Sequence, residues 1–151
     1  MGRFYSVTLP ETSFTAAADL FEITVATDKP VRIWGWSISQ DTDLGDANEE
    51  VLQLTLKRGV TAGTGGSAIT PTPMTENDTA AGATCTNRTT AHTNGTILWL
   101  QGWNLRTVAE HWFTPEAAPV IGADADPVVL HVSAPVDSVT ATGSLLFEEL
   151  A

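Results

Sequence analysis

The sequence predicts an all-β protein, a single-domain antiparallel β-sandwich of the jelly-roll type with about eight strands. The first observation behind this prediction is a series of short segments in which apolar and polar residues alternate, as they do in half-buried strands. The second is that no long segment keeps a helical period without Gly or Pro. The third is the length of 151 residues, which suits one domain with one core.

The N-terminal segment 1–15 is expected to be an arm or an edge strand, because the alternation over 4–9 is loose and ends at a proline. Segment 12–20 is the best helical candidate and is expected to form one turn at most. The following strand, 21–26, has a clearer alternation and is closed by an Asp-Lys-Pro turn. We place the β-sandwich domain at 16–151, after the N-terminal segment 1–15.

The strand expected at 31–39 carries apolar residues on both faces, which is typical of a central strand. Its alternation places Trp34, Trp36 and Ile38 on one face, and we assign both tryptophans to the core. In the strand at 52–57, Leu alternates with polar residues, which indicates one buried face. The remaining strands are expected at 96–103, 106–113, 128–132 and 139–147.

Segment 60–95 interrupts this pattern, because it is rich in Thr, Ala, Gly and Pro and has few apolar residues to bury. We expect it to be a long insert loop in the sandwich. Such inserts in a rigid scaffold are usually functional or disordered. The sequence therefore directs attention to the loops and edges of the domain.

The charge balance excludes some partners. Seven Lys and Arg against 18 Asp and Glu give a net charge of −11, which argues against direct contact with nucleic acid or an anionic membrane. No apolar run has the length of a membrane span or the form of a signal sequence. The lone Cys85 has no partner for an intramolecular disulfide, so we expect a fold that rests on packing and forms in a reducing compartment.

No motif for a metal, a cofactor or catalysis stands out. The acidic segment 41–50 departs from a calcium loop at Gly45, Asp46 and Leu52, and we interpret it as a solvated turn. No Gly-x-Ser-x-Gly elbow is present, and nothing local suggests a base for Cys85. We therefore expect no enzyme activity and no cofactor.

The three histidines His92, His111 and His131 are far apart in the sequence and do not form the His-x-His pair of cupin-type sites. Adjacent Glu110 and His111 face opposite sides of a strand, so they cannot share an ion. We expect surface or rim histidines and no metal site.

Three tryptophans are candidates for an oligomer interface or a surface platform, since aromatic side chains anchor interfaces and also bind sugars. Trp99 and Trp103 lie on one face of the strand 96–103, opposite two leucines, so something other than the domain's own core could cover one face. Trp112 is in a similar position between His111 and Phe113. A core role for these residues is the alternative.

Several short stretches carry a resemblance to a known family: 20–23 (LFEI), 30–34 (PVRIW), 50–54 (EVLQL), 57–59 (KRG), 70–73 (TPTP), 112–116 (WFTPE) and 143–149 (GSLLFEE). Together they are similar to the small jelly-roll auxiliary proteins that decorate the heads of tailed bacteriophages. The resemblance implies a homotrimer that is made in the host cytoplasm and binds between major capsid subunits on the outer capsid surface. It brings no catalytic residues.

In this family-based interpretation, Arg3, Phe4 and Tyr5 are candidate capsid contacts, because an N-terminal arm can add a strand to a neighbour's sheet. Two other hypotheses remain. One is a receptor- or glycan-binding virion module that uses Trp103, Trp112 and 60–95, and the other is a jelly-roll enzyme. The composition of the insert, with few aromatic or charged groups, favours packing against a surface over selective capture of a ligand.

Overall fold

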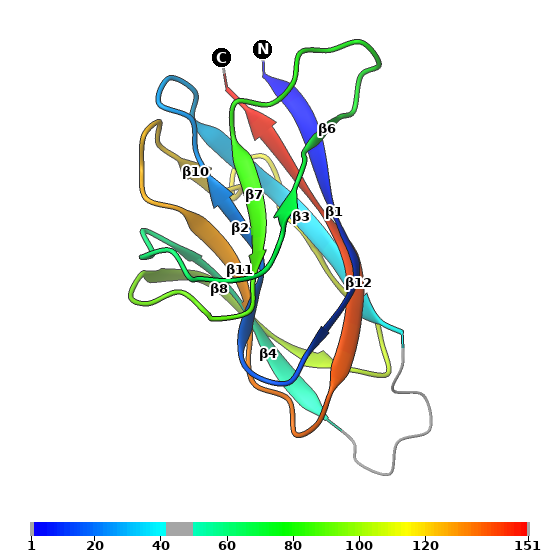
Figure 1. The fold of residues 1–151 in the computed structure, drawn as a ribbon. Coiled ribbons are helices and arrows are strands. Elements are labelled where there is room, and N and C mark those ends of the chain that lie inside the picture. Colours follow the sequence, from blue (N-terminus) through cyan, green and yellow to red (C-terminus); the bar gives the residue numbers. More distant parts are fainter. Residues whose placement is uncertain (1, 42–49, 151) are drawn as a thin grey trace.

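The computed structural model describes residues 2–41 and 50–150, which form two six-stranded antiparallel sheets stacked as a sandwich (Figure 1). The predicted all-β sandwich class is confirmed. The strands are β1 (Arg3–Phe14), β2 (Ala18–Thr24), β3 (Val31–Gln40), β4 (Val51–Arg58), β5 (Ala68–Ile69), β6 (Thr72–Pro73), β7 (Thr84–Arg88), β8 (Thr96–Asn104), β9 (Ala109–Trp112), β10 (Val120–Ile121), β11 (Val128–Val132) and β12 (Val139–Glu149).

Within the described ranges no helix is present, and so none is long and apolar enough to cross a membrane. The helical turn expected within 12–20 is wrong, because β1 and β2 occupy most of that segment. The acidic turn was expected at 41–50, and its residues 42–49 lie outside the described part of the chain.

The strand order is that of a jelly roll. One sheet has the order β10-β3-β12-β1-β6, with β9 also paired to β3, and the other has the order β5-β7-β2-β11-β4-β8. When the insert strands β5, β6 and β7 and the two-residue β10 are left out, the strand orders are β9-β3-β12-β1 and β2-β11-β4-β8. The chain therefore crosses between the sheets at nearly every connection. These eight strands are the predicted ones, and the four additional strands are β5, β6, β7 and β10.

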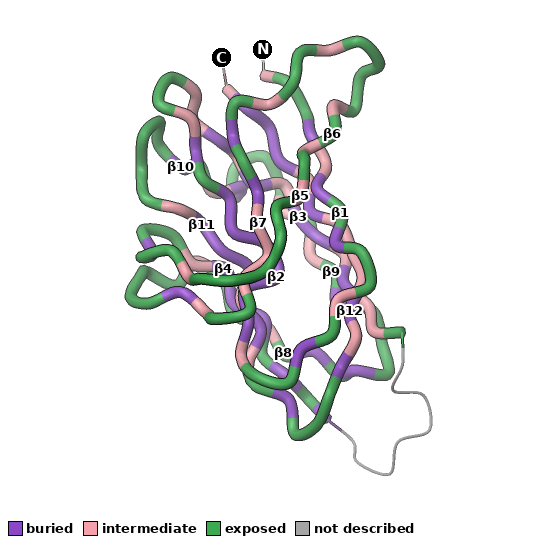
Figure 2. Tube along the Cα trace, in the orientation of Figure 1, coloured by how far each residue is buried: buried purple, intermediate pink, exposed green. Residues whose placement is uncertain are grey.

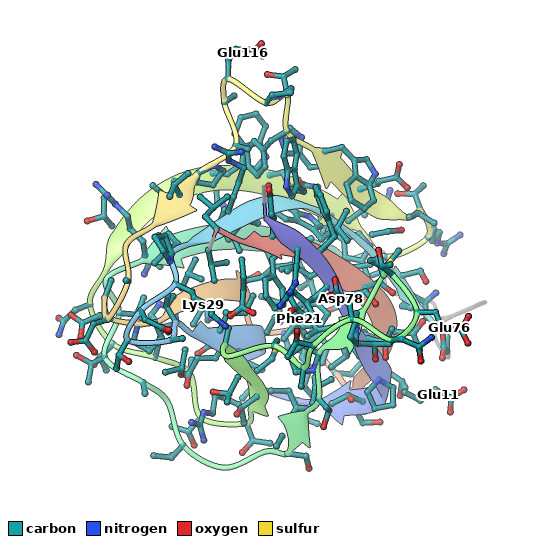
Figure 3. All side chains as sticks on the ribbon, turned by 90° about the horizontal axis from the view of Figure 1, so that it is seen from above. Glu11, Phe21, Lys29, Glu76, Asp78 and Glu116 are labelled. Carbon is teal, nitrogen blue, oxygen red and sulfur yellow. The ribbon has the colours of Figure 1, made fainter. Side chains whose placement is uncertain are left out.

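The core lies between the two sheets, and Figure 2 shows buried residues along the strands of both. In the end-on view of Figure 3, Phe21 lies between the layers, while Glu116 marks the tip of the loop between β9 and β10. The expected alternation in β4 is present, since its three leucines are buried. The largest fully buried side chains are Trp36, Trp103, Tyr5, Phe21 and Phe147.

A β-bulge in β3 changes the predicted faces of that strand. Phe147 pairs with Ile33 and Leu146 with Gly35, so Trp34 is the extra residue. Ile33 is therefore buried, although the simple alternation places it opposite the core tryptophans. The assignment of Trp36 to the core is confirmed, whereas that of Trp34 is wrong, since Trp34 is half-buried on the outer face.

Of the two forms expected for the N-terminal segment, the structure shows a strand. β1 pairs with β12 along most of its length and with the two-residue β6 on its other side. The pairing with β12 shifts between Leu9 and Thr12, around Pro10, whose missing N–H is tolerated at such an irregularity. The segment is thus integrated into the sheet, near its edge.

The insert, residues 60–95, is a long connection between the neighbouring strands β4 and β8, and it contains short strands and β-bridges. Its two ends run beside each other, joined by the bridges Thr61↔Thr93 and Thr64↔Thr90. Further along, β5 and β7 extend the second sheet beyond β2, and β6 extends the first sheet beyond β1. The insert therefore covers the lateral side of the sandwich where β1 and β2 lie.

Buried carboxylates hold the insert in place. Glu22, on β2, accepts a hydrogen bond from the Gly63 amide (3.1 Å) and pairs with Arg88 (3.1 Å). Glu149, at the end of β12, accepts hydrogen bonds from the amides of residues 82–83 (3.0 Å). Both glutamates are almost fully buried. A segment with little apolar surface is thus fixed by hydrogen bonds to charged groups, which are stronger than bonds between neutral groups.

Candidate interaction surface

The opposite lateral side of the sandwich ends at strand β8. Among the residues that the structure describes, β8 is the last strand of its sheet and pairs only with β4. Residues 96–105 include no charged side chain, although the whole chain carries a net charge of −11. Long apolar edge strands are usually shielded, because their free backbone groups pair readily with another chain. The edge of β8 is therefore a candidate contact surface.

An apolar row runs beside this edge on the outer face of the sheet. Ile97 is 55% exposed and Leu100 is 51% exposed, and Val51 of β4 adds a third side chain at 68%. In the ladder with β4, Ile97 lies opposite Lys57 and Leu100 lies opposite Thr55. These β4 positions alternate with the buried leucines of that strand, so Ile97 and Leu100 lie on the face away from the core. We call Val51, Ile97 and Leu100 the β8 row.

On its inner face β8 is joined to the other sheet by an aromatic seam. Trp99 stacks on His111 of β9, with ring centroids 4.0 Å apart, and meets Phe113 edge to face at 5.6 Å. The buried Trp36 also packs against these two rings, with centroid distances of 5.7 Å to His111 and 5.8 Å to Phe113. Burial lowers the pKa of His111, which favours the neutral ring in this stack.

A second apolar feature crosses the outer face of the first sheet. Phe4, Trp34, Trp112, Phe113 and Leu146 line a groove of about 370 Å³. Four of these side chains come from the neighbouring strands β1, β3, β9 and β12, and Phe113 follows β9 directly. We call this feature the aromatic groove. Its lining is almost entirely apolar, which is the character of surfaces that bind proteins or sugar rings.

The groove is held in shape by its neighbours. The Trp34 indole N–H donates to Glu148 Oε2 (3.0 Å), and the Arg32 guanidinium lies 5.6 Å from the Trp34 ring centroid. The Trp112 ring lies over Gly35, where a Cβ atom would collide with it. These contacts fix Trp34 and Trp112 before any partner arrives, which lowers the entropic cost of binding.

The three candidate tryptophans differ in exposure and in surroundings. Trp99 forms the seam and is 39% exposed, while Trp112 lines the groove and is 48% exposed. Trp103 is 1% exposed, and its indole N–H donates to the Thr107 carbonyl (2.9 Å). Trp103 thus belongs to the core, on the same face of β8 as Trp99, and it offers no surface for a partner.

The three N-terminal candidates also have different surroundings. Phe4 is 39% exposed and lines the groove next to Trp34, at a centroid distance of 6.1 Å. Arg3 pairs with Asp78 of the insert (2.9 Å). Tyr5 is buried against Phe147 at 5.5 Å and belongs to the core. Phe4 is therefore the only one of the three whose ring lies in the aromatic groove.

Sequence reasoning did not identify Trp34, Leu146 or the β8 row as surface features. The bulge that turns Trp34 outward cannot be recognised from alternation alone. The uncharged run 96–105 is the signal that could have indicated the free edge.

The buried thiol and two of the histidines lie outside this surface. Cys85 is buried in the core, and burial raises its pKa to about 12. His92 and His131 lie together beside Asp19, on the outer face of the second sheet. His92 is nearly buried, so its predicted rim position is wrong.

Comparison with known proteins adds little. No family model and no curated protein matches the sequence. A chain from the structure of infectious bursal disease virus Gx strain aligns over 99% of this chain and 42% of its own length, with 16% identity and a TM-score of 0.27. The chain thus spans less than half the length of that protein, and a similarity this low supports no argument about fold or function.

Proposed function

We propose that this protein is a structural virion protein that decorates the outer surface of a phage capsid and stabilises it by binding between major capsid subunits. The chain acts as a homotrimer, without enzyme activity and without direct contact to nucleic acid or membrane. The proposal rests on the sequence resemblance described above and on the two apolar surfaces of the sandwich. The β8 row joins the copies of the trimer, and the aromatic groove contacts the major capsid protein.

The observation that carries the proposal is the apolar strand β8 on a strongly acidic chain, since β8 ends its sheet within the described ranges. A charge of −11 disfavours close approach between copies of the chain, except where charged groups are absent. Strand β8 provides such a place, and burying its exposed side chains contributes about 25 cal/mol per Å² of apolar area. In a trimer the contact is heterologous, so β8 of one copy meets a different surface of the next.

The aromatic groove suits the contact with the capsid. It includes Phe4, the one N-terminal candidate in an apolar surface, together with the exposed ring of Trp112. Aromatic anchors of this kind, fixed before binding, are typical of interface hot spots. The two surfaces lie on different sheets, so a chain could engage its trimer partners and the shell at the same time.

Co-sedimentation with emptied capsids tests the capsid contact. We expect Trp112→Ala to lose most binding to the shell while remaining a trimer, because the groove loses an exposed ring. Val136→Lys is a matched surface control, since Val136 is 79% exposed in the turn between β11 and β12 and lies in neither apolar surface. Equal binding by wild type and Trp112→Ala would overturn the assignment of the groove.

One observation favours a second function, glycan or receptor binding. The groove presents two indole rings beside two phenylalanines, and the half-buried Arg32 lies next to Trp34. Such a platform can stack on a sugar ring. A glycan array with wild type and Trp112→Ala decides this point. Signals that disappear in the variant support the second function, and an array without signals rejects it.

A further inference from the structure

A cluster of three potential ligands lies away from both apolar surfaces. Asp19 is on β2, His131 is its partner on the neighbouring β11, and His92 belongs to the insert. Because Asp19 and His131 are opposite each other in the ladder, their side chains point to the same face of the sheet. The insert crosses this face and brings His92 to them, so three separate segments meet at one point.

The donor atoms converge closely. Asp19 Oδ1 lies 2.8 Å from His92 Nδ1 and 2.9 Å from His131 Nδ1, and the three potential ligand atoms all lie within 4.8 Å of one another. The two imidazole rings are nearly perpendicular, with centroids 5.0 Å apart. The His92 amide also donates to Asp19 Oδ2 (2.8 Å), which fixes the carboxylate.

Burial and charge also suit a metal ion. The side chains of Asp19 and His92 are 0% and 3% exposed, whereas that of His131 is 19% exposed, so the cluster has an access route on one side. The Asp19 carboxylate is held in place by three hydrogen-bonding contacts, from the His92 amide and from both imidazole rings, so its oxygens already face the point where an ion would bind.

We propose that Asp19, His92 and His131 bind a divalent transition-metal ion of the zinc class, with water completing the coordination. Two imidazole nitrogens and one carboxylate form a ligand set that zinc and its neighbours accept and that calcium and magnesium disfavour. The ion ties the insert to β2 and β11. It is a structural ion that stabilises the covered side of the sandwich, independently of trimer formation or capsid binding.

Lys57 gives the proposal a distinctive test. Its Nζ lies 3.2 Å from His92 Nε2. An ammonium group has donors only, so this contact requires the ring proton to be on Nδ1. Metal binding through Nδ1 moves the ring proton to Nε2, and Lys57 must then turn away. Lys57 is half-buried and has a long, flexible side chain that can do so. Removing its charge should therefore strengthen metal binding.

Titration of the chelator-treated protein with Zn²⁺ and Co²⁺ tests the site, read out by calorimetry, thermal unfolding and the visible absorption of bound Co²⁺. We expect one ion per chain and a rise in Tm, since the ion binds only the folded arrangement. Lys57→Met should bind about tenfold more tightly, the scale of effects from residues next to metal ligands. His131→Gln should lose binding and still fold, because its side chain is partly exposed.

His111→Gln serves as the matched control, because it removes a histidine outside the cluster and should leave metal binding unchanged. Wild-type protein that binds no Zn²⁺ or Co²⁺ at micromolar concentration would overturn the proposal. Equal binding by wild type and His131→Gln would overturn it as well, since the ion would then sit elsewhere. Neither readout depends on capsids or on the oligomeric state.

Discussion

The two lateral sides of the sandwich are closed in different ways. On one side the insert adds β7 to β2 and β6 to β1, and buried carboxylates bind its backbone. On the other side β8 is the last strand in the described part of the chain, and the aromatic seam of Trp99, His111 and Phe113 joins the sheets. The strands of the insert thus cover one lateral side, whereas the other lateral side presents the apolar strand β8 at its edge.

This difference indicates that the residues that stabilise the fold and the residues proposed for association lie on different sides of the sandwich. The insert has little apolar surface, so its position depends on hydrogen bonds to buried charges, which fail if one partner is removed. The β8 side has apolar surface in excess, and replacing its exposed residues leaves the core intact. We therefore expect variants of the first side to change folding and variants of the β8 row to change association.

The largest effect on folding is expected for Glu149→Ala on the covered side. The amides of residues 82–83 lose their acceptor in a buried place, which should lower the free energy of unfolding by about 3 kcal/mol. Urea denaturation measures the loss. Glu11→Ala, at an exposed position on β1, should be close to neutral, and equal losses in both variants would contradict the proposed role of Glu149.

The seam should show the next largest effect. Trp99→Ala removes the ring that stacks on His111 and should cost about 2 kcal/mol, less than a fully buried tryptophan because Trp99 is 39% exposed. Trp112→Ala, which lines the groove instead of joining the sheets, should cost less. If urea denaturation reversed this order, the groove and not the seam would hold that side of the sandwich.

A smaller, pH-dependent effect should come from His111. Because burial lowers the pKa of its folded form, the unfolded chain takes up a proton first as the pH falls below the ordinary value of about 6.5. The contribution of His111 to stability is therefore complete above that value and is lost as the pH falls through the folded pKa. His111→Phe should reduce the difference between unfolding free energies measured near neutral pH and in mildly acidic buffer. A difference as large as that of wild type would contradict the prediction.

The smallest effect on folding is expected for Leu100→Lys. The residue is 51% exposed, so its replacement should change the free energy of unfolding by less than about 0.5 kcal/mol. The same change places a charge in the β8 row and should prevent association between copies. A variant that unfolds far more easily than wild type would show that Leu100 supports the fold itself.

The sequence predicted the eight strands of the jelly roll because their alternation directly reflects a buried and an exposed face. It did not predict the path of the insert, since Thr- and Gly-rich strands gain their position from distant carboxylates such as Glu22 and Glu149. The convergence of Asp19 with His92 and His131 was missed for the same reason: it depends on the pairing of β2 with β11 and on the return of the insert. Of the candidate surface residues, Trp99, Trp112 and Phe4 lie at exposed apolar positions. Trp103 and Tyr5 do not, because their position depends on packing that alternation alone does not specify.

Molar mass by light scattering across a dilution series measures the proposed self-association without any partner present. We expect a trimer for wild type and for Val136→Lys, and a monomer for Leu100→Lys under the same conditions. A wild-type monomer at every concentration would contradict the proposed self-association. A Leu100→Lys trimer would show that the chain associates through a surface other than the β8 row.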